Sequence, residues 1–140
     1  MFIFGDSLVD VGNSNHLKFS LNKADFPHYG IDFPDKVSTG SFCNGKNAAD
    51  FLEVGLPTSP PYLSMISSKS NENFLNGVSF ASGGAGIFDD TDKQNQSSSL
   101  TNQVDYFSDV NGEQKQHLNS TNLRQVLSKS LFPIVNCDWK

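Results

Sequence analysis

Short apolar segments bounded by turn residues predict a sheet that begins at the front of the chain. Residues 2–4, Phe-Ile-Phe, form a continuous apolar run that ends at Gly5-Asp6-Ser7. Such a run is typical of a strand that is buried on both faces. We therefore predict a buried strand that opens into a turn at Ser7. Residues 8–15 are predicted to begin a helix with Asp6 or Ser7 near its cap.

Two more strands are predicted later in the chain. Residues 77–82 alternate weakly between apolar and polar side chains and lead into Gly83-Gly84-Ala85-Gly86. Residues 131–135 are mainly apolar. Pro133 has to stand at the start or the edge of this last strand, because proline cannot donate to a sheet ladder.

Helices and irregular segments separate these strands. Apolar residues recur at helical spacing in three stretches: 47–54, 100–110 and 123–127. Proline, glycine or polar residues predict three irregular segments: 23–42, 57–61 and 89–99. The first is predicted to be a long surface loop, and the last a mobile one. Strands alternating with helices indicate a layered α/β fold with a parallel sheet, within one domain that spans residues 1–140.

Composition narrows the class of protein. The chain has 140 residues, 36% hydrophobic, with twelve Phe and a net charge of −5. Its ten Lys and Arg form no cluster, so we expect no surface for nucleic acid or an anionic membrane. No stretch approaches the roughly 20 apolar residues of a membrane span. These features predict a soluble chain.

The cysteines and the candidate processing signals give little information about the class of protein. Cys43 and Cys137 suit no metal site, and two free thiols are expected rather than a bridge. Residues 95–97 and 119–121 are glycosylation sequons, a short pattern that often arises by chance. The first residues do not form a signal peptide, so we expect either a cytosolic protein or a missing start.

Ser7 is the candidate nucleophile. A serine hydroxyl needs a base, usually a histidine that a carboxylate orients, and it needs the exposure that a sharp turn after a strand provides. The segment around Ser7 has that layout. The local alternative is that Asp6 and Ser7 simply cap a helix.

Four segments carry a resemblance to a known family. The run Phe4-Gly5-Asp6-Ser7-Leu8-Val9-Asp10-Val11-Gly12-Asn13-Ser14-Asn15 resembles the opening signature block of the plant GDSL esterase/lipases, members of the SGNH hydrolase superfamily. Residues 39–51, 55–63 and 77–87 resemble further segments of that family, in its order and with similar spacing. Together they span nearly the whole chain.

The resemblance implies a fold and an activity. The implied fold is a three-layer α/β/α, flavodoxin-like SGNH hydrolase fold whose C-terminal part is missing. The implied activity is hydrolysis of carboxylic esters of small molecules or lipids, without metal or organic cofactor, by a secreted enzyme. Ser7 matches the nucleophile, and Gly83 is predicted to donate its N–H to the oxyanion, with Gly84 or Gly86 as alternatives. Without the resemblance, these glycines would be expected only to form a tight turn.

Departures from the family predict an N-terminal portion with little or no turnover. The family's Gly-x-Asn-Asp block should follow residues 131–135, where the chain has Asn136-Cys137-Asp138 and only a weak substitute in Asn136. The family's Asp-x-x-His pair, which supplies the remaining triad members, is absent. Asp25 and His28 have that spacing but lie in the predicted loop beside Pro27, so we expect them to be no triad.

Two rival functions remain open at this point. One is a truncated, non-catalytic family member that acts as a binding remnant or is the product of an interrupted gene. The other is a flavodoxin-like domain that binds an anion where the turn of residues 83–86 meets a helix N-terminus. Ile87-Phe88 follows the glycines in place of the Lys and Ser or Thr of a phosphate loop, which argues against the second rival.

Overall fold

A computed structural model describes residues 1–52, 55, 57–68, 74–91 and 96–137. The strands are β1 (Phe2–Gly5), β2 (Val78–Ser79) and β3 (Ile134–Val135). The helices are α1 (Asn13–His16), α2 (Ala48–Leu52), α3 (Tyr62–Ser68), the 3₁₀ helix η1 (Phe74–Asn76), α4 (Leu100–His117) and α5 (Ser120–Ser128).

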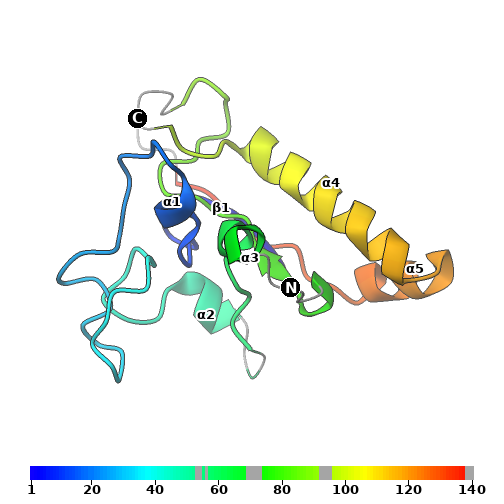
Figure 1. Ribbon diagram of the computed structural model, residues 1–140, viewed down its shortest axis with the longest axis horizontal. Coiled ribbons are helices and arrows are strands. Elements are labelled where there is room, and N and C mark those ends of the chain that lie inside the picture. Colours follow the sequence, from blue (N-terminus) through cyan, green and yellow to red (C-terminus); the bar gives the residue numbers. More distant parts are fainter. Residues whose placement is uncertain (53–54, 56, 69–73, 92–95, 138–140) are drawn as a thin grey trace.

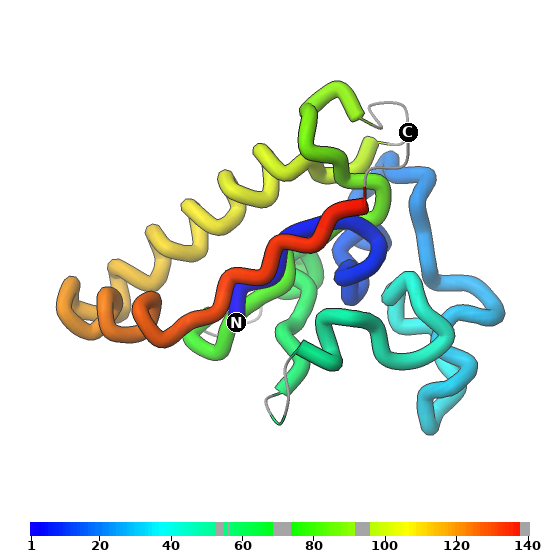
Figure 2. The backbone as a smooth tube through the Cα atoms, turned by 180° about the vertical axis from the view of Figure 1, so that it is seen from behind, coloured from blue at the N-terminus to red at the C-terminus, as the bar shows by residue number. Residues whose placement is uncertain are grey.

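The three strands form one parallel sheet with β1 in the centre. The strand order is β2-β1-β3. In β1, Phe2 lies opposite Val78, and Phe4 lies opposite Ile134. Figure 2 shows the end of the chain, in red, running beside β1, in blue, although the two are far apart in sequence. All three predicted strands are confirmed, and Pro133 stands immediately before β3, where a proline can be tolerated.

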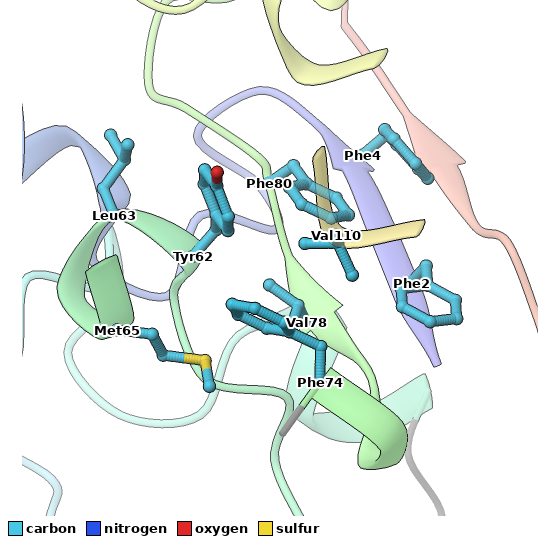
Figure 3. Close-up of a cluster of buried hydrophobic side chains, with 9 residues drawn as sticks. All are labelled: Phe2, Phe4, Tyr62, Leu63, Met65, Phe74, Val78, Phe80 and Val110. Carbon is cyan, nitrogen blue, oxygen red and sulfur yellow. The ribbon is translucent and has the colours of Figure 1, made fainter. Parts of the chain in front are cut away.

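One face of β1 packs on the larger core. Phe2 and Phe4 point to the same face, because side chains alternate along a strand. They join residues of β2 and the position after it, α3, η1 and α4 in a cluster of nine buried side chains (Figure 3): Phe2, Phe4, Tyr62, Leu63, Met65, Phe74, Val78, Phe80 and Val110. Phe4 and Phe80 lie with ring centroids 5.1 Å apart. The early apolar run thus becomes the centre of the hydrophobic core.

The opposite face of β1 carries a smaller core. Ile3 packs there with Val9, Ala81 and Ala49 of α2. Helices therefore cover both faces of the sheet, and Figure 1 shows α4 on one side of β1 and α2 on the other. The layering confirms the predicted α/β/α fold. Among the described residues no strand pairs with the outer edge of β3, so the sheet has three strands where α/β sheets usually have five or six.

The helix predictions are confirmed with two differences. The helix expected within residues 8–15 is the short α1, which begins only at Asn13. Helix α3 was not predicted: it starts directly after the proline-rich segment 57–61, whose prolines indicated irregular structure. Proline is tolerated there, since the first N–H groups of a helix lack partners in any case.

The structure agrees with some of the remaining predictions from the sequence, and others fall outside the described residues. Residues 23–42 contain no helix or strand, as expected of a loop. Residues 53–54 of the predicted second helix and residues 92–95 of the predicted mobile loop lie outside the described residues. None of the helices that the structure describes is long and apolar enough to cross a membrane.

Candidate active site

The carboxyl ends of the three strands meet at one edge of the sheet, and Ser7 lies there. The N–H of Ser82, which follows β2, donates to Gly5 O over 3.0 Å. The N–H of Asp6 donates to Val135 O of β3 over 3.1 Å. Strand order reverses at β1, because the chain passes from β2 on one side of it to β3 on the other. In open α/β sheets, ligands bind outside the carboxyl ends of the strands at such a switch point.

Asp6 shapes the turn that presents Ser7. Its Oδ1 accepts the Leu8 N–H over 2.9 Å, and its Oδ2 accepts the Cys137 N–H over 2.6 Å. Ser7 is half-buried, and its hydroxyl makes no hydrogen bond with any residue that the structure describes. The alternative in which Asp6 or Ser7 caps a helix is wrong, since α1 begins at Asn13.

Gly5 lets the chain turn sharply at the end of β1. Its φ of 145° is one that side chains rarely adopt, and a Cβ at this position would lie 1.8 Å from Val135 O. Any larger residue would push β3 away from β1. Glycine therefore places Ser7 where the strand ends without separating the two strands.

Gln103 of α4 fixes the backbone of Gly5. Its Oε1 accepts the Gly5 N–H over 2.9 Å, and its Nε2 donates to Gly5 O over 2.9 Å and to Ser98 O over 3.1 Å. Gln103 is fully buried, whereas Val104, which the helical spacing placed on the core side, is 55% exposed. A polar residue between Leu100 and Phe107 on an otherwise apolar stripe was the signal that sequence reasoning missed.

Asp10 joins the segment after Ser7 to the glycine segment after β2. Its buried carboxylate accepts N–H groups from Gly12, Asn13 and Ser14 and, over 2.9 Å, from Gly83. Burial raises the pKa of Asp10, and these hydrogen bonds oppose that rise. The arrangement indicates a structural role for Asp10, because its carboxylate has no access to a substrate.

Asn13 strengthens the same connection. Its Nδ2 donates to Ser79 O over 2.8 Å and to Ala81 O over 3.0 Å, while its Oδ1 accepts the Leu63 N–H over 2.9 Å. One buried amide thus ties α1 to β2 and α3. From the sequence, Asp10 and Asn13 were identified only as part of the segment that resembles the family, and no role was predicted for either.

The N–H of Gly83 is already paired inside the protein. It donates to Asp10 Oδ2 over 2.9 Å and to Ser14 Oγ over 2.8 Å. Gly84 is half-buried with a φ of 82°, and its N–H makes no hydrogen bond within the described residues. Geometry therefore favours the predicted alternative, Gly84, over Gly83 as an oxyanion donor, and the assignment of either glycine stays a prediction.

Asn136 lies between the end of β3 and the glycine segment. Its Nδ2 donates to Ala85 O over 2.8 Å, and its buried Oδ1 has no partner among the described residues. The side chain thus links two of the loops at this edge of the sheet. Asp138, two positions further along the sequence, lies outside the described residues.

No histidine is hydrogen-bonded to Ser7 in the part of the chain that the structure describes. His16, His28 and His117 are all exposed. Asp25 and His28 lie on the long loop, and His28 has a φ of 89°. Cys43 and Cys137 are free thiols, as expected. Over the described ranges, no group of three or more His, Cys, Asp or Glu side chains is arranged to hold a metal ion.

Comparison with known proteins shows which family the chain resembles. The model of the family described as GDSL-like Lipase/Acylhydrolase matches residues 1–128. A GDSL esterase/lipase of Arabidopsis thaliana is 47% identical over 142 residues, which cover 96% of this chain and 38% of the relative. No solved structure matches.

Other relatives match part or nearly all of the chain. A second GDSL esterase/lipase of Arabidopsis thaliana is 49% identical over 92 residues, covering 64% of this chain and 25% of the relative. The Anther-specific proline-rich protein APG of Brassica napus is 35% identical over 142 residues, covering 96% of this chain and 31% of that protein. The chain thus spans well under half the length of these curated relatives.

Proposed function

Because the chain belongs to the GDSL-like lipase/acylhydrolase family, we propose that it provides the nucleophile and part of the oxyanion hole of a serine ester hydrolase. The observation that carries the proposal is the position of Ser7. Its hydroxyl, which has no hydrogen-bond partner among the described residues, stands just beyond the carboxyl end of the central strand, at the switch point of the sheet. Residues 1–140 would then form part of a single hydrolase domain.

The proposed reaction proceeds in two steps. Ser7 Oγ attacks the carbonyl carbon of a carboxylic ester, and its proton passes to a base and then to the departing alcohol. The backbone N–H groups of Ser7 and Gly84 hold the negative oxygen of the tetrahedral intermediate. Water then attacks the acyl-serine, releases the carboxylic acid and restores the Ser7 hydroxyl. These steps require no metal or organic cofactor, and the substrate would be an ester of a small molecule or lipid.

The base is the part that the described residues do not supply. All three histidines are exposed and none is bonded to Ser7. Losing the base of such a triad lowers the rate by several orders of magnitude. We therefore expect the chain alone to hydrolyse esters at close to the uncatalysed rate. The family resemblance also favours a secreted enzyme.

Because the described residues place no base beside Ser7, a second candidate function is a non-catalytic family member that binds ligand at the same edge. The anion-binding alternative loses support, because residues 87–91 after the glycines form no helix and α4 begins only at Leu100. A helix N-terminus directly after the turn was what that hypothesis required.

The test uses a chimera in which residues 1–130 replace the matching part of the Arabidopsis relative that is 47% identical. We expect this chimera to hydrolyse short-chain p-nitrophenyl esters. Ser7→Ala should lower kcat by at least about 10³-fold, because it removes the nucleophile. Ser108→Ala, which removes an exposed hydroxyl from α4, is the matched control and should leave kcat unchanged. Retention of most activity by Ser7→Ala would exclude Ser7 as the nucleophile.

A further inference from the structure

Two side chains from separate parts of the chain hold the carbonyl of Gly83. Asn22 Nδ2 donates to Gly83 O over 3.0 Å, and Ser97 Oγ donates to the same oxygen over 2.6 Å. Asn22 Nδ2 also lies 3.1 Å from Ser97 Oγ, which closes a triangle of polar contacts. Asn22 immediately precedes the long loop of residues 23–42, and Ser97 lies three residues before the start of α4. Neither residue stands in the segments that carry the family resemblance.

We propose that Asn22 and Ser97 are positioning residues that fix the peptide between Gly83 and Gly84, so that the Gly84 N–H is held ready as the oxyanion donor. This inference rests on the proposed function. It adds to it the two side chains that orient the donor.

Peptide geometry links the two glycines. In a planar trans peptide, the C=O of one residue and the N–H of the next point in opposite directions. No cis peptide bond occurs in the described residues. Holding Gly83 O on the side of Asn22 and Ser97 therefore directs the Gly84 N–H to the opposite side. That N–H has no partner within the described residues, as a donor awaiting a ligand requires.

The Gly-Gly sequence explains why this clamp matters. Glycine adopts positive and negative φ about equally well, so a peptide between two glycines can turn over at little cost. Gly83 is anchored through its N–H by Asp10 and Ser14, but that contact leaves the following peptide free to rotate. Turning it over would break both hydrogen bonds to Gly83 O.

Lys23, the residue after Asn22, holds this segment of the chain in place. Its ammonium group donates to three backbone carbonyls, those of Ser14, Asn15 and Leu17, over 2.9, 3.1 and 2.7 Å. These carbonyls surround the end of α1, where a positive charge is favourable. Asn22 is therefore attached to the same short helix that pairs with the Gly83 N–H, so both sides of Gly83 share one support. An oxyanion donor stabilises a transition state only if it is aligned beforehand.

The first experiment follows the Gly84 amide in the chain labelled with ¹⁵N-glycine. Asn22→Asp keeps the shape of the side chain and removes the donor, Ser97→Ala removes the hydroxyl, and Ser97→Thr retains it. We expect the Gly84 cross-peak to shift and broaden in Asn22→Asp and Ser97→Ala, while the cross-peaks of Gly5 and Gly12 stay in place. Ser97→Thr and the control Ser108→Ala should resemble the unchanged chain. An unmoved Gly84 peak in both variants, or equal movement of all glycine peaks, would overturn the proposal.

The second experiment measures kcat and KM in the chimera, which also serves if a variant of the chain alone fails to fold. Loss of one oxyanion donor costs roughly 10²–10³-fold in kcat, so a misaligned donor should cost about 10–100-fold. We expect that fall in Asn22→Asp and Ser97→Ala, with KM nearly unchanged and with Ser97→Thr retaining kcat. Unchanged kcat in both variants, while Ser7→Ala is inactive, would refute the clamp and leave the proposed nucleophile intact. Activity in Ser7→Ala would instead refute the proposed function.

Discussion

Replacing Gln103 by Met tests whether one buried amide holds the nucleophile turn. Methionine has a similar length and no branch, so it fills the space but makes none of the three hydrogen bonds. Gly5 O keeps its bond from the Ser82 N–H. The Gly5 N–H and Ser98 O lose the Gln103 amide as their partner.

The expected cost follows from these losses. A buried polar group left without a partner costs about 1–3 kcal/mol. Two such groups, partly offset by burying an apolar side chain, give a loss of about 2–4 kcal/mol in the free energy of unfolding. That is a large part of the roughly 5–15 kcal/mol that stabilises a typical domain. Because Gly5 lies two residues before Ser7, the turn that presents the hydroxyl should loosen as well.

Gln114, on the same helix, provides the matched control. It is also buried, but its Nε2 makes a single bond, to Phe74 O over 2.9 Å, and its Oε1 is already without a partner among the described residues. Phe74 O would keep the bond that it accepts from the Gly77 N–H. Gln114→Met should therefore change the free energy of unfolding by less than about 1 kcal/mol.

Urea denaturation followed by far-ultraviolet circular dichroism measures both variants. With a slope of about 2 kcal/mol per molar urea, Gln103→Met should lower the midpoint by about 1–2 M, and Gln114→Met by less than about 0.5 M. Equal losses in the two variants would show that burial of the amide, and not its three bonds to Gly5 and Ser98, determines the cost. That result would refute the reasoning.

Two other predictions concern the turn and the larger core. Gly5→Ala should destabilise the fold by more than about 3 kcal/mol, because the new Cβ would clash with Val135 O. The control Gly112→Ala, whose Cβ would have no atom within 4 Å, should leave the stability unchanged or raise it. Thermal denaturation of the two variants measures the difference. Burial, with acidic residues of α4, raises the pKa of Tyr62 to about 12. The unfolded chain releases this proton near pH 10, so the free energy of unfolding should fall as the pH rises from 10 to 12. The fall should be smaller in Tyr62→Phe, and an equal fall in both proteins would contradict this prediction.

Local pattern was enough to predict the elements that depend on a few adjacent residues. The run at residues 2–4 became β1 because three successive apolar residues can be buried only in an element covered on both faces. The apolar spacing at residues 100–110 became α4 for the same kind of reason. Ser7 could be singled out because it directly follows such a strand and a glycine.

Contacts between distant residues decided the remaining features. Periodicity predicted a helix at residues 100–110 but placed Val104 inside, whereas packing turned Gln103 inward. The buried amide is tolerated there because the backbone N–H and C=O of Gly5, 98 positions earlier, satisfy its hydrogen-bonding groups. No local window contains both residues, so sequence spacing alone could not reveal the pair.

The sequence by itself determined that glycines follow β2, and only the tertiary structure decided what each of them does. Glycine permits either direction of the peptide at residues 83 and 84, so the chain alone leaves the choice of oxyanion donor open. Asp10 and Ser14 take the Gly83 N–H, while Asn22 and Ser97 hold its carbonyl. These partners come from segments 14 to 73 residues away. A peptide direction is set by where its hydrogen-bond partners lie in space, and the folded chain alone brings them together.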